Sequence, residues 1–437
     1  MAPAAARQAS TAVTAEPAGQ APARLRVGIF VTTVRPYSPS QARLQERIFE
    51  GLRTLGGDRY DFVVLSYDPA PDPLLGWPHH VVRRRGRWSQ AARGAVARVA
   101  GALAGLWKLA GATGGRTLAA LQRWKKLEPA HYQQLRDLDV RILWNMNHHA
   151  LTTPTPFIRT IWDVNQRILP MYPEYAYVRY GFEGLDAGLA ESLARASYVI
   201  TGTAEGRRQL IELFGTDQRK IRIVPFLAPV LPVGEAAKVD GRYILYPSRF
   251  WPHKNHVVVL EALHALRTRH GLDLMCVLVG SDGGNLDYVM RYAERLGVRD
   301  LIDYRGRVSE AELGALYAGA WALTYASGVG PDNLPPLEAM ALGCPVITAD
   351  VPGAEDQFGE AALRFHPTDE AALVAQLLRL EREPGLRDEL IRRGSALAAR
   401  LPPEGYVAAV LEILDEFAKV ARAWERCDSL LASAAAF

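Results

Sequence analysis

The chain has 437 residues, enough for two domains. Apolar residues make up 49% and charged residues 22%, which is ordinary for a soluble globular protein, and no apolar run reaches the length of a membrane span. Three cysteines, Cys276, Cys344 and Cys427, lie far apart, which excludes a disulfide framework and a paired-cysteine metal site and favours a reducing cytoplasm.

The N-terminal part of the chain predicts a Rossmann-like domain over residues 25–230. Residues 1–24 are rich in Ala, Pro, Gln and Thr and are expected to form a disordered tail rather than a secretory signal. Strands then alternate with helices, which favours parallel βαβ units in a doubly wound sheet. Strands are expected at 25–31, 61–66, 140–144, 159–162, 198–201 and 221–224, and helices at 41–55, 184–196 and 204–213.

A basic segment at 83–126 interrupts this domain. It holds eleven Arg and Lys residues, no Asp or Glu, and three tryptophans, so the rest of the chain carries about −7 of the net charge of +4. A basic, amphipathic, Trp-bearing segment suits an anionic membrane surface. A solvated helical hairpin with an incidental charge bias is the alternative. Nucleic-acid binding is not expected, because no nucleic-acid motif accompanies the charge.

The alternation restarts after a Pro-rich stretch at 226–235, a candidate interdomain linker. A second α/β domain is predicted over 238–400, and the segment 401–437 is expected to carry a helix at about 406–424. Two open α/β domains bind ligand at the carboxyl ends of their strands, in the cleft between them. The remaining strands are expected at 243–246, 274–279, 302–304, 322–324 and 345–348, and a further helix at 370–381.

The loop after the strand at 243–246 carries two permanent cations, Arg249 and Lys254. Lys254 stands just before a predicted helix N-terminus, where the helix macrodipole disfavours a positive charge. A bound anion removes this conflict, and the planar fork of Arg249 beside the point charge of Lys254 suits a diphosphate. The alternative is that both side chains point into water.

The segment 330–347 predicts a loop, a short helix and a buried strand. Asn333 is placed at the N-cap, prolines at the first turn, and Glu338 in that first turn beside free backbone N–H groups. Phosphate at the helix end and ribose hydroxyls on the carboxylate would suit a sugar nucleotide. A well-capped structural helix with a surface glutamate is the equal alternative.

Other polar positions give weaker signals. The glycine-rich turn that begins at Gly280 and Ser281 suits a ligand or an ordinary turn. Asp163, Arg167 and the pair His148 and His149 follow strands of the first domain, where they would reach the cleft or be satisfied by their own loops. The chain lacks the dinucleotide-binding, P-loop, paired-cysteine and H-E-x-x-H patterns, so metal dependence has no positive support.

Taken in order, these segments resemble the retaining family 4 glycosyltransferases of the GT-B fold, most strongly from about 243 to 365. The matching motifs are Tyr-Pro-Ser-Arg-Phe-Trp-Pro-His-Lys-Asn-His, Val-Gly-Ser-Asp-Gly-Gly-Asn with Arg-Gly-Arg-Val-Ser-Glu, and Leu-Pro-Pro-Leu-Glu-Ala-Met-Ala-Leu-Gly-Cys-Pro-Val-Ile. The resemblance implies two Rossmann-like domains, with the last helix packed back on the first. It also implies a donor site in the second domain, at Arg249, Lys254, Gly280, Ser281, Arg307, Val308, Gly330, Asn333, Leu334, Pro335 and Glu338.

Within this resemblance, Arg249 and Lys254 would bind the donor pyrophosphate, the loop 305–308 would lie beside the nucleobase, and Glu338 would bind the ribose. The chain departs from the family at Gly330, where a glutamate usually contacts the donor sugar; this variant recurs in a subgroup that builds bacterial surface polysaccharides. Trp162 stands in place of a first-domain histidine, and the glycine-rich loop after the first strand is replaced by residues 36–40.

The resemblance therefore implies a hexosyltransferase that uses a nucleotide-diphosphate sugar, GDP-mannose as first guess, and retains the anomeric configuration without a metal or cofactor. Asp163 is a candidate for positioning the acceptor, a saccharide or lipid-linked saccharide in surface polysaccharide synthesis. Together with the basic segment, this predicts a cytoplasmic protein held peripherally at the inner membrane. The alternatives are a non-catalytic, membrane-associated subunit of the same fold and a sugar-nucleotide epimerase.

Overall fold

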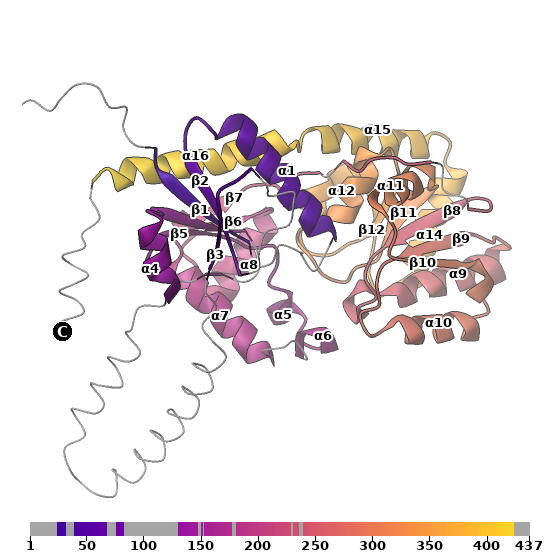
Figure 1. Cartoon of the computed structure of the whole chain (residues 1–437). Coiled ribbons are helices and arrows are strands. Elements are labelled where there is room, and N and C mark those ends of the chain that lie inside the picture. Colours follow the sequence, from indigo (N-terminus) through magenta and orange to yellow (C-terminus); the bar gives the residue numbers. More distant parts are fainter. Residues whose placement is uncertain are drawn as a thin grey trace, which may run out of the picture.

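The computed structural model describes residues 24–31, 39–67, 76–82, 130–146, 150–151, 153–176, 181–228, 230–235 and 239–423. Two parallel β-sheets lie side by side, each covered by helices (Figure 1). We refer to residues 24–235 as the first unit and to residues 239–400 as the second unit. The sequence prediction of two doubly wound α/β sheets is confirmed.

The first sheet has seven parallel strands in the order β3-β2-β1-β4-β5-β6-β7. Its inner strands are almost wholly buried, as expected of a sheet with helices on both faces. The strands are β1 (Arg26–Val31), β2 (Asp61–Ser66), β3 (His79–Val81), β4 (Ile142–Asn145), β5 (Phe157–Thr160), β6 (Tyr198–Thr201) and β7 (Ile221–Ile223). The helices are α1 (Pro39–Leu55), α4 (Ala130–Asp137), α5 (Asn165–Ile168), α6 (Pro173–Ala176), α7 (Gly181–Arg195) and α8 (Ala204–Phe214).

The second sheet has six parallel strands in the order β10-β9-β8-β11-β12-β13. The strands are β8 (Tyr243–Pro247), β9 (Met275–Val279), β10 (Ile302–Gly306), β11 (Ala322–Tyr325), β12 (Val346–Ala349) and β13 (Ala362–Phe365). The helices are α9 (His256–His270), α10 (Leu286–Arg295), α11 (Glu310–Gly319), α12 (Leu334–Ala341), α13 (Ala354–Phe358), α14 (Glu370–Arg382) and α15 (Leu386–Ala399).

The last described helix, α16 (Pro403–Ala421), returns to the first unit and packs against α1 (Figure 1). Its apolar face is buried, and the Tyr406 ring stacks on Trp144 of β4 with centroids 6.4 Å apart. Asp415 accepts hydrogen bonds from Arg59 and Tyr60 of the first unit. The chain therefore crosses between the two units twice, once before β8 and once before α16.

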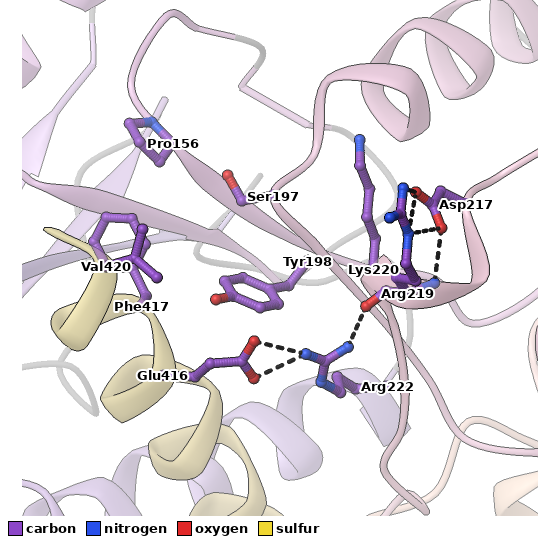
Figure 2. A pocket seen from close by; sticks show the side chains of 10 residues that line it. All are labelled: Pro156, Ser197, Tyr198, Asp217, Arg219, Lys220, Arg222, Glu416, Phe417 and Val420. Atoms are coloured by element: carbon purple, nitrogen blue, oxygen red, sulfur yellow. Dashed lines mark hydrogen bonds and ion pairs between the residues drawn. The ribbon is translucent and has the colours of Figure 1, made fainter. Parts of the chain in front are cut away.

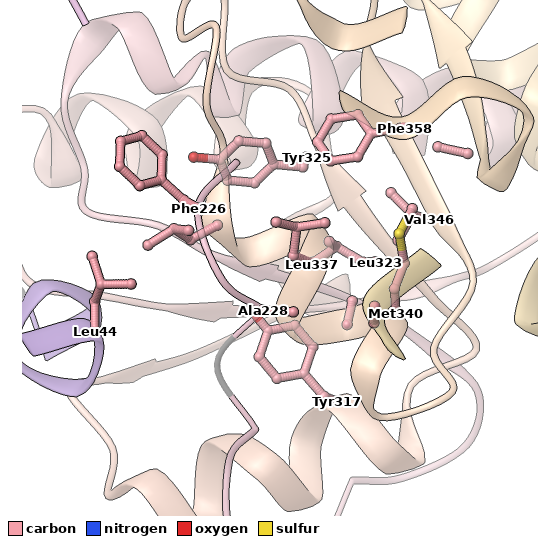
Figure 3. Close-up of a cluster of buried hydrophobic side chains, with 14 of the residues drawn as sticks. Leu44, Phe226, Ala228, Tyr317, Leu323, Tyr325, Leu337, Met340, Val346 and Phe358 are labelled. Carbon is pink, nitrogen blue, oxygen red and sulfur yellow. The ribbon is translucent and has the colours of Figure 1, made fainter. Parts of the chain in front are cut away.

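One hydrophobic cluster continues from the first sheet into the second. Leu44 of α1 and Phe226 after β7 belong to the same buried cluster as Tyr317 and Leu337 of the second unit (Figure 3). Because the two units share apolar core, the loops at their facing edges are held close together.

Candidate functional site

The strand order of the second sheet reverses between β8 and β11, and open α/β sheets bind ligands at such a switch point. The loops that follow these two strands meet there through Lys254. Its Nζ donates to Tyr325 Oη at 3.0 Å and to Ser327 Oγ at 3.3 Å. Tyr246 Oη in turn donates to the Lys254 carbonyl and fixes its backbone. The half-buried ammonium group of Lys254 is thus held by neutral hydroxyls at the switch point.

Arg249 lies in the same loop and is exposed. Its guanidinium carbon lies 4.7 Å from the centroid of the Trp251 ring, a cation–π contact. Across the residues that the structure describes, no salt bridge reaches Arg249 or Lys254. Two cations on one loop without a carboxylate partner leave an uncompensated positive charge, which favours an anionic ligand.

Gly280 and Ser281 follow β9 and lie directly beside this cationic loop. The Gly280 N–H donates to the Gly306 carbonyl at 2.7 Å, and the Phe250 N–H donates to the Ser281 carbonyl at 3.1 Å. A Cβ atom at position 280 would lie 2.1 Å from the Ser248 carbonyl oxygen. Glycine at 280 therefore allows the two loops to approach as closely as they do.

The N-terminus of α12 differs from the sequence prediction in two respects. Asn333 occupies the N-cap, but its side chain makes no cap hydrogen bond and donates instead to the Gly330 carbonyl at 2.9 Å. Glu338 stands in the second helical turn, because the helix already begins at Leu334. Pro335 and Pro336 have no N–H to offer, so this helix end has fewer free donors for an anion than predicted.

Glu338 is also not on the surface, since only 1% of it is exposed. Its Oε1 accepts from Arg43 Nη2 at 2.6 Å, and its Oε2 accepts from Tyr317 Oη at 2.9 Å. Burial, followed by the nearby Glu338 charge, raises the pKa of Tyr317 well above its ordinary value, so the phenol remains a donor. The burial excludes the alternative of a surface glutamate, and sequence reasoning missed Arg43, whose partner lies 295 positions away.

Arg43 also contacts α11, the helix that follows the loop 305–308 predicted to lie beside a nucleobase. Its Nη1 contacts Glu310 Oε1 at 3.3 Å, at the start of α11. Arg307 and Val308 precede this helix after β10; Arg307 is exposed and Val308 is half-buried. Burial would lower the Arg43 pKa, but the carboxylates of Glu338 and Glu310 outweigh it and raise the pKa. Arg43 thus joins the start of α11 to α12.

The first unit contributes Asp163, which follows β5 and accepts a hydrogen bond from the Asn165 N–H at 3.2 Å. Arg167 does not accompany it, because its guanidinium group pairs with Asp186 of α7 at 2.6 Å. Of the two alternatives left open for Arg167, a position in the cleft or an ion pair outside it, the structure favours the ion pair. His148 and His149, the segments 36–38 and 83–126, and the residues after 423 lie outside the described residues.

Sequence reasoning also missed Asp332, in the loop between β11 and α12. Its carboxylate accepts from the Gly202 N–H of the first unit, where a Cβ atom on residue 202 would lie 2.1 Å from Asp332 Oδ1. Gly330 in the same loop has φ +119°, and a Cβ atom there would lie 2.7 Å from Asn333 Oδ1. The acid of this loop is therefore at position 332 and faces the first unit.

A separate surface hollow of about 450 Å³ lies between β6, β7 and α16 (Figure 2). Two ion pairs line it, Arg222 with Glu416 at 2.8 Å and Arg219 with Asp217 at 2.7 Å, while Lys220 donates to the Ala194 carbonyl. Because four of its five charged side chains are paired, the hollow has less to offer a charged ligand than the loops around Lys254. Within the described ranges we find neither a cluster of metal-ligating side chains nor a helix that is long and apolar enough to cross a membrane.

Comparison with solved structures identifies the architecture. HepE from Anabaena, in complex with UDP and glucose, superposes with a TM-score of 0.63 at 15% identity, over 90% of this chain and all of that one. The chain has the GT-B fold. Residues 232–396 also match the family model described as glycosyl transferases group 1.

Relatives named as glycosyltransferases agree with this result. The O-antigen chain mannosyltransferase B of Escherichia coli is 28% identical over 65% of this chain and 78% of its own length. The O-antigen chain mannosyltransferase RfbU of Salmonella typhimurium is 26% identical over 54% of this chain and 64% of its own. D-inositol 3-phosphate glycosyltransferase of Acidothermus cellulolyticus is 29% identical over 52% of this chain and 54% of its own length. The chain thus spans about half to three quarters of these relatives, and the matches support a glycosyltransferase.

Proposed function

We propose that this GT-B protein transfers a hexose from a nucleotide-diphosphate sugar to a saccharide or lipid-linked saccharide, with retention at the anomeric carbon. The observation that carries the proposal is the position of Lys254, whose ammonium group joins the loops after β8 and β11 at the switch point of the second sheet. Arg249 on the same loop, also without a carboxylate partner in the described structure, adds a second charge for the diphosphate.

In this mechanism, the nucleotide diphosphate leaves from the anomeric carbon, and negative charge develops on its phosphate oxygens. Lys254 and Arg249 stabilise that charge from fixed positions, which is the role that a metal ion plays in other transferases. Gly280 and Ser281 bring the backbone after β9 against the cationic loop and would line the diphosphate. Transfer should therefore persist in the presence of a chelator.

We assign the nucleoside part of the donor to the loop after β10 and to α12. Arg307 and Val308 would flank the base, and Glu338 would accept hydrogen bonds from the ribose hydroxyls. Gly330 and Asn333 lie in the turn that leads into this helix, Leu334 and Pro335 begin the helix, and all four would pass beside the donor. Since Arg43 covers Glu338, the ribose must displace Arg43 from the carboxylate.

For the donor we propose GDP-mannose and for the acceptor a surface-polysaccharide precursor, since two of the relatives are named as O-antigen chain mannosyltransferases. Asp163, at the carboxyl end of β5, is assigned to the acceptor hydroxyl. The basic segment 83–126 would hold the protein peripherally on the cytoplasmic face of the inner membrane, near a lipid-linked acceptor.

A donor panel tests this function. The purified full chain is incubated with GDP-mannose, GDP-fucose, UDP-glucose and UDP-galactose, with and without a polyprenyl-linked saccharide and with and without EDTA. We expect nucleotide release that depends on both one donor and the acceptor and that EDTA does not reduce. Release of no nucleotide from any donor with any acceptor would refute the proposal, and loss of release with EDTA would refute metal independence alone.

A further inference from the structure

A contact between the two units reaches the cationic loop after β8 from the side of the first unit. It joins Glu174 of α6, at the edge of the first unit that faces the second, to His253 of the short turn Pro252–Lys254 (Figure 1). The His253 N–H donates to Glu174 Oε1 at 3.0 Å, and the ring nitrogen Nδ1 of His253 contacts the same oxygen. One carboxylate oxygen of the first unit therefore holds both the backbone and the ring of the residue that precedes Lys254.

This contact is buried and is covered by aromatic rings. Only 4% of His253 and 11% of the Glu174 side chain are exposed. The Tyr175 ring stacks on the His253 ring with centroids 5.7 Å apart, and the Tyr172 ring meets it edge-on at 6.1 Å. Because water is largely excluded, loss of the carboxylate would leave the His253 N–H without an acceptor, which is costly. The contact therefore restrains His253 relative to the first unit.

His253 passes this restraint to the residues around Lys254. The His253 carbonyl accepts the Gly328 N–H at 2.9 Å, in the loop after β11. Lys254 is the next residue of the same turn, and its ammonium group donates to Tyr325 and Ser327 of that loop. The first unit thus holds the turn at His253, and the loop after β11 holds it at His253 and Lys254. A shift of this turn would move the ammonium group with it.

We propose that Glu174 is a positioning residue of the donor site, which holds His253 and thereby keeps the Lys254 ammonium group where the donor diphosphate binds. The inference rests on the proposed function, in which Lys254 binds that diphosphate. It has one consequence for the whole molecule. The donor site is made of loops of the second unit, but it reaches its full affinity only while α6 of the first unit is in contact with them.

Glu174 has a second effect on the donor, and that effect has the opposite sign. Its carboxylate places negative charge beside the cationic loop, and Oε2 is buried without a hydrogen-bond partner in the described structure. Negative charge near the site repels a diphosphate, so removing the charge should tighten nucleotide binding. Loss of positioning should weaken it. A variant that loses the charge but keeps the acceptor oxygen separates the two effects.

Four variants of the full chain test the proposal. Glu174→Gln loses the charge and keeps an acceptor oxygen for the His253 N–H, whereas Glu174→Ala loses both. Glu174→Asp keeps the charge on a shorter side chain and is the milder replacement should Glu174→Ala fail to fold. Glu191→Ala, on α7 where the exposed Glu191 pairs with Arg195 at 3.3 Å, is the control for loss of a surface carboxylate. Urea denaturation establishes that each variant is folded, and calorimetry measures its affinity for GDP and for UDP.

We expect Glu174→Ala to weaken binding of the nucleotide that the wild type prefers by about tenfold or more, the effect of losing a hydrogen bond to a charged group. Glu174→Asp should weaken it in the same direction. Glu174→Gln should bind at wild-type affinity or more tightly, and Glu191→Ala at wild-type affinity. Unchanged or tighter binding in both Glu174→Ala and Glu174→Asp, or the same loss in Glu174→Gln as in Glu174→Ala, would overturn the proposal.

Hydrogen exchange provides a readout that requires neither nucleotide nor turnover. The amides of His253 and Lys254 should exchange faster in Glu174→Ala than in the wild type and at the wild-type rate in Glu174→Gln, while α10 stays unchanged. Unchanged exchange at these amides in Glu174→Ala would refute the inference whatever the affinity. If Lys254→Ala loses nucleotide affinity and Glu174→Ala does not, the proposed function stands and the positioning role fails. If the wild type binds neither nucleotide, the proposed donor site fails, and the role of Glu174 fails with it.

Discussion

Arg43 Nη2 donates to Glu338 Oε1 at 2.6 Å and thereby joins α1 of the first unit to α12 of the second. Both side chains are almost fully covered, with 6% of the arginine side chain and 2% of the glutamate side chain exposed. A buried pair of this kind fixes the relative position of the units. It also places the arginine on the carboxylate that we assign to the donor ribose, so closure of the units and binding of the donor use the same group.

The stability of the chain should depend on keeping this pair intact. Removing one partner leaves an uncompensated buried charge, so we expect Arg43→Ala to lower the free energy of unfolding by about 3–5 kcal/mol. The double variant Arg43→Met with Glu338→Gln should recover most of that loss, since neither residue then carries a charge. Urea denaturation of the wild type, Arg43→Ala and the double variant measures these free energies of unfolding. A cost below about 1 kcal/mol for Arg43→Ala would show that the pair is not buried in solution.

The same pair predicts opposite effects on nucleotide binding. Arg43→Met removes the competitor for Glu338 and should leave GDP binding unchanged or tighter. Glu338→Gln removes the ionised acceptor for the ribose hydroxyls and should weaken GDP binding about tenfold. Both are measured by calorimetry at equal pH. Wild-type affinity in Glu338→Gln would place the ribose elsewhere.

Gly280→Ala should damage the donor loop. The added methyl group would lie 2.1 Å from the Ser248 carbonyl oxygen, so the loops after β8 and β9 must separate. We expect a loss of about 1–3 kcal/mol in the free energy of unfolding and weaker GDP binding. Gly188→Ala in α7, where nothing lies within 4 Å, is the control and should raise stability by up to about 1 kcal/mol. Normal GDP binding by Gly280→Ala would contradict the assignment.

His256 should make the second unit sensitive to acid. Its ring stacks on Phe250 with centroids 4.2 Å apart, and burial first, then the Lys254 charge, lowers its pKa to about 3. The unfolded chain takes up this proton near pH 6.5 and the folded chain does not, so its contribution to stability is complete above pH 6.5. That contribution falls by up to about 1.4 kcal/mol per pH unit below it. His256→Phe should lose less stability between pH 7 and 5; an identical decline would exclude His256 as the cause.

The basic segment 83–126 is tested by liposome flotation of the full chain and of a variant without these residues. We expect the full chain to float with vesicles that contain anionic phospholipid and to do so less at high salt, because the attraction is electrostatic. The deletion variant should stay at the bottom of the gradient while still binding GDP. Equal flotation of both proteins would refute the membrane role.

The sequence predicted the elements whose pattern is local. The strands β2, β6 and β8 and the helices α8 and α14 begin within one residue of their expected positions, since buried strands and capped helices carry their own signals. β3 was missed because it is a three-residue edge strand whose side chains stay exposed. The helix α15 was missed as well; one of the three positions on its buried face is a glycine, a weak helix signal.

The residues of the candidate site were likewise predicted where their sequence pattern is local and missed where it is not. Arg249 and Lys254 were found because a cationic loop between a strand and a helix is a local pattern. Arg43 and Asp332 were not found, because their roles arise from partners in the other unit. The burial of Glu338 could not be predicted for the same reason, because its arginine partner is distant in the sequence.

The most direct test of the donor site is calorimetry of GDP binding to the wild type, Lys254→Ala, Arg249→Ala and the exposed control Arg291→Ala. The account predicts binding by the wild type and the control. It predicts losses of about tenfold or more in GDP affinity for each of the other two, and a fall in transfer of roughly a hundredfold or more. Unchanged affinity in both Lys254→Ala and Arg249→Ala would contradict the central claim that this loop binds the donor diphosphate.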